Sequence, residues 1–360
     1  MGDKAVGFNR YFAYKEQTAW GTKASGLANT MVPLRNGAIF EANPILAPRE
    51  DAIYTLSPLT QYFTPPKFVP WSGSFLLVSA TSAAATFRDL FRAVYGKELT
   101  AAGPPVTKTY NILDPPIDGG TDATPVNTLY AHGLTLHEQT NNSAGTAIYS
   151  HEVQDAVVTE LSVTWRPDQP VMIGLRGMSS DLQDGASSVS LTVPGGPIMT
   201  YRHVKDTSTA GLYIGTANPP VTANDNVIFS QATLTISNPL RYVPFMGNGS
   251  TKEARIPVRD GQMSITLDVT MDVEAVTASL YDQSDITAHW KAGTGVNVNF
   301  LTYITANDIF QFQTTASTAG CFIETFRNTA SGLGAMQHQM RLKVAPAALA
   351  DTLIKMTSAT

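Results

Sequence analysis

Hydrophobic and polar side chains alternate without a break over residues 263–273, where apolar residues occupy every odd position. This two-residue period is typical of a β-strand with one buried face and one solvated face. The even positions carry small polar or acidic side chains, including Asp268 and Asp272. The same kind of pattern predicts further strands at Val157–Trp165, Ala232–Ile236, Val296–Ile304 and Met340–Val344.

Helical spacing is clearest over Ala83–Tyr95. Ser82 stands at the N-cap position and Gly96 follows the last turn. The apolar stripe of this segment consists of Phe87, Leu90, Phe91, Val94 and Tyr95. One helix beside many alternating strands predicts a mainly β fold of the α+β kind.

Two stretches rich in turn formers interrupt the strand pattern, at Ala101–Pro125 and Gly185–Asn226. Each keeps apolar residues, such as Leu212 and Ile214 in the second. Apolar side chains are unusual in flexible linkers, which are exposed to water. We therefore expect ordered loops, or loops that a partner orders.

The order of elements is similar in the two halves of the chain. A strand near Ile39–Leu46 and a strand from Phe229 each lead into a long proline-bearing segment, then an alternating strand and a helical pattern. The second helical pattern, over Val276–Gln283, is the weaker one. We therefore predict two tandem units, residues 1–183 and 184–360.

Composition favours packing against neighbouring subunits. Charged residues make up only 15% of the 360 residues and the net charge is −5. Residues 1–180 carry 13 basic and 15 acidic groups, and residues 181–360 carry 11 and 14. No half is basic, so tight binding of nucleic acid phosphates is not expected, and low charge suits burial between subunits.

Cys321 is alone, so the fold is expected to hold by packing without an intrachain disulfide. Met1–Arg10 has no apolar run of signal-peptide length, and no run approaches a membrane helix. We expect a protein that folds in a cytoplasm and does not bind membranes.

Candidate chemistry is sparse. No metalloprotease motif, nucleophile elbow or phosphate-binding loop is present, so no enzyme activity and no cofactor are expected. His137-Glu138 and His151-Glu152 can face each other across a hairpin that turns at Asn141–Gly145. Such a ladder is either a divalent metal site or a cross-strand polar ladder, and the second reading is favoured because adjacent strand residues point to opposite faces.

Two acidic pairs are candidates for the general acid and base of a glycosidase. Asp268 and Asp272 lie roughly 13 Å apart at ~3.3 Å per residue, too far to act together. Asp282 and Asp285 are expected to end a short helix.

Several segments resemble the tail tube proteins of long-tailed bacteriophages. Tyr14–Thr22, followed by Pro33–Glu41, is similar to the opening of these proteins, with a Glu, an aromatic residue and Gly-Thr in this order. Val153–Val171 is similar to a strand of that family that leads into a proline-bearing turn. Ser230–Pro239 and Gly261–Leu267 resemble it again, so the resemblance spans nearly the whole chain and rests on the order of the segments.

The resemblance implies β-sandwich or barrel-like units with a flanking helix, assembled into rings that stack into a hollow tube for double-stranded DNA. It implies a virion tail location, and as partners other copies of the chain, a tape measure protein, a tail terminator and tail-tip proteins. Two units in one chain imply trimeric rings with a sixfold appearance.

Two sets of residues are candidates for function on this reading. Asp268 and Asp272 are expected to face the lumen or a subunit seam. The long segments Ala47–Pro70 and Arg241–Pro257 are expected to reach neighbouring rings, because their apolar side chains are costly to leave in water. The candidate inter-ring residues are Tyr62, Phe63, Phe68, Tyr242 and Phe245.

Two rival functions are a head or tail decoration protein and a carbohydrate-binding β-sandwich. A decoration protein forms monomers or trimers that never polymerise. A sugar-binding domain gathers exposed aromatic residues on one face. The chain's tryptophans, which are Trp20, Trp71, Trp165 and Trp290, are instead scattered over the sequence and are expected in the core.

Overall fold

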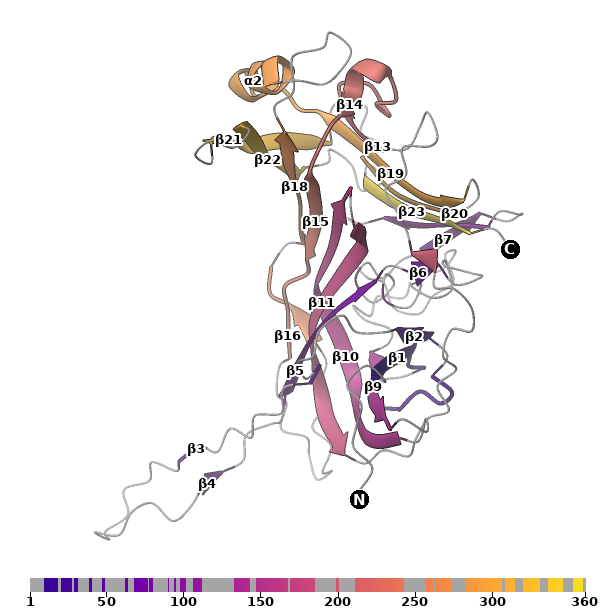
Figure 1. The fold of residues 1–360 in the computed structure, drawn as a ribbon. Coiled ribbons are helices and arrows are strands. Elements are labelled where there is room, and N and C mark those ends of the chain that lie inside the picture. The colour runs from indigo at the N-terminus through magenta and orange to yellow at the C-terminus, as the bar shows by residue number, and fades with distance from the viewer. Residues whose placement is uncertain are drawn as a thin grey trace, which may run out of the picture.

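The protein folds into antiparallel β-sheets with little helix (Figure 1). The computed structural model describes residues 10–18, 21–27, 29–31, 39–40, 47–48, 62–63, 68–76, 78–79, 90, 94, 98–101, 106–111, 133–142, 147–167, 169–184, 199–200, 211–242, 257–261, 263–272, 283–305, 308–314, 320–330, 336–345 and 352–358. The expected mainly β fold is confirmed.

A ten-stranded sheet forms the main body of the described structure. Its path runs β2-β1-β9-β10-β15-β18-β22-β21, while β11 pairs with β10 and β5 pairs with β11. The strands are β1 (Arg10–Glu16), β2 (Asn29–Met31), β5 (Phe68–Leu76), β9 (Leu134–Asn141), β10 (Ala147–Arg166), β11 (Gln169–Asp184), β15 (Gln231–Ser237), β18 (Ser264–Asp272), β21 (Cys321–Ala330) and β22 (Met336–Val344).

A seven-stranded sheet lies against one end of the first, in the order β14-β13-β19-β20-β23-β8-β7. Its strands are β7 (Glu98–Ala101), β8 (Val106–Asn111), β13 (Gly211–Gly215), β14 (Asn226–Val227), β19 (Asn297–Thr305), β20 (Asp308–Thr314) and β23 (Thr352–Ser358). Helix α2 (Gln283–Ala292) and the 3₁₀ turn η1 (Ala223–Asp225) complete this end.

Three two-stranded ribbons stand apart from the large sheets. They pair β3 (Ala47–Pro48) with β4 (Tyr62–Phe63), β6 (Val78–Ser79) with β12 (Met199–Thr200), and β16 (Leu240–Tyr242) with β17 (Pro257–Arg259). Figure 1 shows β3 and β4 well away from the body of the molecule, beyond the lower end of β5.

Trp165 of β10 joins the two large sheets. Its ring lies 4.2 Å from that of Phe300 and 6.0 Å from that of Phe310, centroid to centroid, and its indole N–H donates to the Thr302 hydroxyl at 2.7 Å. All of these side chains are buried, and the Trp165 indole N–H finds its hydrogen-bond acceptor inside the core between the two sheets.

A second aromatic cluster fills the other end of the ten-stranded sheet. Phe12 of β1 lies 4.9 Å from Phe75 and 6.3 Å from Trp71, both on β5. Because β1 and β5 are distant in the strand order, this contact shows that the sheet curls back on itself to bury their side chains.

Strand β10 changes partners along one edge. Residues 147–156 pair with β9 and residues 160–165 pair with β15, while β11 follows the other edge. Asp155 lies at this change with a φ of 53°, between register shifts that bend the strand. Gly133 packs against the bend, where an added Cβ would come within 2.6 Å of the Asp155 Cα.

The alternation of side chains predicts the strands well. The five strands predicted from alternation lie within or overlap β10, β15, β18, β19 and β22, and Ile265, Leu267 and Val269 are buried as expected. Of the strand expected near Ile39–Leu46, the structure describes Ile39 and Phe40, and Phe40 forms a β-bridge with Trp71; the other residues lie outside the described part. The predicted hairpin is confirmed as the β9–β10 pair. Of the predicted helix Ala83–Tyr95, the structure describes Leu90 and Val94, and both are helical and buried; the other residues lie outside the described part.

Three predictions of local structure need correction. Neither turn-rich segment is all loop. Val106–Asn111, in Ala101–Pro125, forms strand β8, and Leu212 and Ile214, in Gly185–Asn226, belong to the buried strand β13. Asp285 stands in the first turn of α2, so it begins a helix instead of ending one, as suits a carboxylate near the positive end of a helix. The pattern Val276–Gln283 lies outside the described residues except for Gln283, where α2 starts.

The division into units 1–183 and 184–360 stays a prediction. In the sheet topology, strands from both ranges pair with one another: β10 with β15, and β8 with β23. The two ranges therefore share both large sheets.

Candidate functional site

One face of the ten-stranded sheet is polar across four adjacent strands, and we call it the polar sheet face. Strand alternation and register place on it Glu160, Ser162, Thr164 and Arg166 of β10, Gln231, Thr233, Thr235 and Ser237 of β15, Ser264, Thr266, Asp268, Thr270 and Asp272 of β18, and Gln337, Gln339, Arg341 and Lys343 of β22. The residues that alternate with them point to the opposite face of the sheet and form the buried core.

A single row crosses this face through Thr164, Thr233, Asp268 and Arg341, which are register partners on successive strands. The hydroxyls of Thr164 and Thr233 are 3.4 Å apart. Short hydroxyl and amide side chains dominate the rest of the face, so most of its polar groups carry no charge.

Asp268 is paired with an arginine. Arg341 donates through Nε to Asp268 Oδ1 at 2.7 Å and through a terminal nitrogen to Oδ2 at 3.2 Å. Both side chains remain accessible, at 41% for Asp268 and 48% for Arg341. The hydrogen bonds and charge of Asp268 raise the pKa of Arg341. This two-point contact balances the negative charge of Asp268, one of the two aspartates that the sequence predicts on this face.

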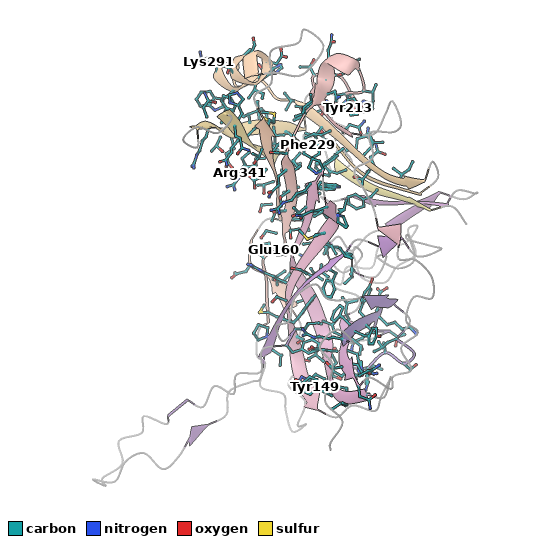
Figure 2. The ribbon with its side chains drawn as sticks, viewed as in Figure 1. Tyr149, Glu160, Tyr213, Phe229, Lys291 and Arg341 are labelled. Atoms are coloured by element: carbon teal, nitrogen blue, oxygen red, sulfur yellow. The ribbon has the colours of Figure 1, made fainter. Side chains whose placement is uncertain are left out.

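Glu160 forms a looser, exposed ion pair, in which its carboxylate lies 3.7 Å from Nε of Arg176 on β11. Arg166 donates to the side chain of Gln231 at 3.1 Å. Figure 2 shows Glu160 and Arg341 on the side of the sheet away from Tyr213 and Phe229, which lie with the seven-stranded sheet. The polar sheet face therefore carries both acidic and basic side chains, and Asp268 is paired with Arg341.

Asp272 ends β18 opposite Gln337, on the same face as Asp268 by alternation. No observation tests whether either residue faces a channel, so their lumen role stays a prediction. The sequence did not show the partner of Asp268, because Arg341 is distant in sequence and meets it only through the β18–β22 register.

The candidate inter-ring residues fall into three groups. Tyr62 and Phe63 form β4, in the projecting β3–β4 ribbon, and Tyr242 closes β16 opposite Pro257. Phe68 does not lie in a loop: it begins β5 and pairs with Ser180 of β11, which corrects that assignment. Phe245 lies outside the described residues.

The predicted histidine and glutamate ladder exists, and it divides between two faces. Register pairs His137 with Glu152 and Glu138 with His151. His137 and Glu152 are buried together on one face, with Nδ1 of the imidazole 3.3 Å from Oε2 of the carboxylate. Glu138 instead forms an ion pair with Arg10 of β1.

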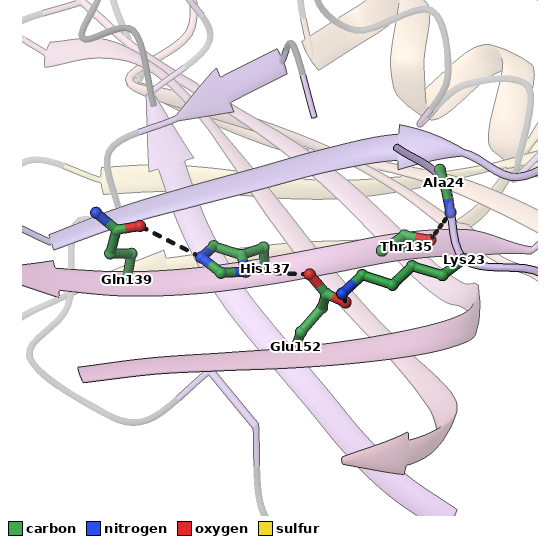
Figure 3. Close-up of polar contacts among 6 residues, drawn as sticks. All are labelled: Lys23, Ala24, Thr135, His137, Gln139 and Glu152. Carbon is green, nitrogen blue, oxygen red and sulfur yellow. Dashed lines mark hydrogen bonds and ion pairs between the residues drawn. The ribbon is translucent and has the colours of Figure 1, made fainter. Parts of the chain in front are cut away.

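Glu152 has a second partner, Lys23, which forms an ion pair with its other carboxylate oxygen (Figure 3). Nε2 of His137 lies 3.4 Å from the side-chain oxygen of Gln139. Burial raises the pKa of Glu152, but hydrogen bonds from His137 and Lys23 outweigh it, so the pKa is lowered overall. Within the described residues, no group of three or more His, Cys, Asp or Glu side chains converges as a metal site would require.

The tryptophans are only in part core residues. Trp71 and Trp165 are buried, as expected, and Trp71 donates its indole N–H to the Met178 carbonyl at 3.4 Å. Trp290 on α2 is 45% exposed, which corrects the expectation for that residue, and Trp20 lies outside the described residues. Exposed Tyr149 lies at the opposite end of the molecule from α2, so these two do not form one aromatic platform (Figure 2).

Comparisons with known proteins give little. No model of a known protein family matches the chain, and no curated protein matches it. Among solved structures, the chain is similar in part to one from the tail of an empty GTA (gene transfer agent) particle with C6 symmetry, at 11% identity and a TM-score of 0.26. That likeness covers 38% of this chain and 92% of the other, and at this TM-score it carries no weight for function. In the part of the chain that is described, no helix is long and apolar enough to cross a membrane.

Proposed function

We propose that the protein is a structural subunit of a phage-like tail, which assembles with copies of itself into stacked rings that form a tube for DNA. The observation that carries this proposal is the polar sheet face. This broad sheet surface has a buried core behind it, and its carboxylates Glu160 and Asp268 each lie within ion-pair distance of an arginine.

Such a surface suits the wall of a DNA channel. A wall of unpaired basic residues would retain DNA, because about 6–10 phosphate contacts give strong, salt-dependent binding. A wall of unpaired acids would repel it. Threonine, serine and glutamine side chains beside ion pairs do neither, so DNA passes without being held.

Ring closure requires each subunit to offer one surface and accept on another. Strand β21, ten residues long, ends the ten-stranded sheet, and among the described residues only Val296 pairs with its outer edge, at Cys321. A long edge strand is a template for pairing with another chain, and a second copy of this protein is the partner that a closed ring needs. We infer trimeric rings with a sixfold appearance, since each chain supplies two similar units in this proposal.

Stacking is assigned to the projecting ribbon β3–β4 and to the β16–β17 ribbon. The first predicted inter-ring segment contains the β3–β4 ribbon, which extends away from the sheets, and the β16–β17 ribbon joins the two ends of the second segment. The remaining partners of a tail tube, which are a tape measure protein, a terminator and tip proteins, follow from the family resemblance. The proposal places the protein in the tail of the virion and assigns it no enzyme activity.

Deletion of residues 55–64 tests the proposal, because it removes β4 from the ribbon and leaves both large sheets intact. The full chain is expected to sediment as long tubes, whereas the deletion variant is expected to stop at rings or monomers. Substituting Tyr62 and Phe63 with Ser is the matched variant that keeps chain length. Tubes of normal length and stability from the deletion variant would refute the stacking role.

The two rival functions predict different results. A decoration protein would remain monomeric or trimeric at every concentration, with or without residues 55–64. A carbohydrate-binding domain would be retained on a polysaccharide column, which the exposed Trp290 and Tyr149, at opposite ends of the molecule, do not favour.

A further inference from the structure

A short segment near the N-terminus, residues 21–27, lies across the face of the β9–β10 hairpin that carries His137 and Glu152, and we call it the strap (Figure 3). Gly21 and Gly26 have φ angles of 71° and 64°, the left-handed backbone that glycine adopts without strain. The strap leads on to β2, which pairs with β1.

Four polar contacts hold the strap in place. The Gly21 N–H donates to Asp155 Oδ1 at 2.7 Å, and Lys23 forms its ion pair with Glu152. The Ala24 N–H donates to the Thr135 hydroxyl at 2.9 Å, and the ammonium of Lys15 donates to the Ser25 carbonyl at 2.6 Å. Two of the four contacts end on buried carboxylates of β10.

Apolar contact contributes less to this attachment. The strap buries Ala24 and Leu27, whereas the surface beneath it carries the polar side chains of Thr135, His137 and Gln139. The opposite face of the same strands packs Phe12, Tyr14, Leu134 and Leu136 into the core. Since the strap is held chiefly by charged and polar groups, its attachment depends on their ionisation far more than the core does.

We propose that the strap is an acid-released latch, closed while the Glu152 carboxylate is ionised and holds Lys23, and open once that carboxylate takes up a proton. Opening uncovers the polar surface of β9 without unfolding the sheets. The titratable groups near Glu152 are His137 on β9, Lys23 on the strap, and Lys15 and Tyr11 on the same face of β1, while β11 places Gln183 opposite it.

The direction of the effect follows from Glu152. In the closed state burial raises the pKa of Glu152, but His137 and Lys23 lower it below its ordinary value of 4.5, and opening removes the contribution of Lys23. The open state therefore binds more protons than the closed one below pH 4.5, and falling pH favours opening until the closed-state pKa is passed. Above pH 5 the latch stays closed.

Hydrogen exchange followed by mass spectrometry tests the latch. Protection factors, which remove the intrinsic pH dependence of exchange, are compared for peptides covering the strap and β18 between pH 7 and pH 3. In the native protein we expect strap protection to be constant above pH 5 and to fall below pH 4.5, while β18 keeps its protection.

Three variants distinguish the contribution of the Lys23–Glu152 ion pair from that of uncharged contacts. Lys23→Met changes a half-exposed side chain and is expected to lower strap protection at pH 7 by roughly tenfold, the loss of one charged hydrogen bond. Glu152→Gln is expected to do the same, and both weaken the response below pH 4.5. Thr135→Val removes an uncharged contact and keeps that response.

Two results would overturn the proposal. One is a strap whose protection at pH 7 is the same in Lys23→Met as in the native chain. The other is loss of protection in the strap and β18 together at the same pH, which means global unfolding. Because Lys23 is accessible, its variant gives a result even where Glu152→Gln does not fold.

Discussion

Trp165 and Thr302 face each other across the two large sheets, with the indole N–H donating to the hydroxyl at 2.7 Å and both side chains fully buried. Replacing Thr302 with Val removes the acceptor and leaves a buried donor unpaired. We expect the free energy of unfolding to fall by about 1–3 kcal/mol, measured by urea denaturation.

Thr233→Val is the matched control, because Thr233 lies on the polar sheet face and contacts only Thr164 and Gln231 among the hydrogen bonds described for it. It is expected to change stability by less than about 0.5 kcal/mol. Equal losses in both variants would mean that the Trp165 indole does not depend on Thr302.

Replacing both Asp268 and Asp272 with Lys converts the polar sheet face into a basic one. Both members of the Asp268–Arg341 pair are exposed, and exposed pairs contribute only about 0–1 kcal/mol, so folding is expected to survive. DNA retention by the assembled protein, measured by fluorescence anisotropy at low salt, is expected to rise and to disappear as salt is added.

The control for this prediction replaces both aspartates with Asn, which removes negative charge without adding positive charge. It is expected to retain far less DNA than the lysine variant. Should the lysine variant bind no more DNA than the native chain, these residues do not line a DNA channel.

His338 is expected to make folding stability depend on pH, because its imidazole is buried. Burial lowers the pKa of this imidazole, whose Nδ1 lies 2.6 Å from Asn328 Oδ1. Below pH 6.5 the unfolded chain takes up a proton that the folded protein resists, so folding stability falls as the pH drops from 6.5 toward the folded pKa.

The contribution of His338 is isolated by comparing unfolding free energies of the native chain and His338→Gln from pH 8 to pH 5. We expect the native chain to lose stability relative to the variant as the pH falls below 6.5. His289→Gln on α2 controls for removing a histidine. A difference that does not change with pH would contradict the prediction.

Ring stoichiometry tests the two-unit hypothesis. If each chain supplies two similar units, a ring with six units contains three chains, and native mass spectrometry of isolated rings is expected to give three times the mass of the 38.6 kDa chain. Rings of six full chains would contradict the duplication.

The period of the side chains was enough to predict the strands, because alternation reports which face of a strand is buried. Residues 264–272 show this most clearly, with Leu267 in the core and Asp268 outside. The expected turn at Asn141–Gly145 was enough to predict the β9–β10 hairpin and the pairing of His137 with Glu152, since a short turn fixes the register of the strands beside it.

Contacts between side chains that are distant in the chain could not be predicted from the sequence. Arg341 reaches Asp268, and Lys23 reaches Glu152, only after strands distant in the chain are brought together, and nothing local marks either contact. Strand β13 was missed because the glycines and prolines around Leu212 and Ile214 outweighed their apolar signal. Asp285 was placed at the wrong end of α2 because an acidic residue beside a weak helical pattern does not by itself show on which side the helix lies.

Negative-stain electron microscopy of the purified full chain tests self-assembly most directly. At raised protein concentration we expect rings with a central channel that stack into tubes of constant diameter. A field of single particles without rings at every concentration and salt condition would contradict the proposal that this protein forms the wall of a tail tube.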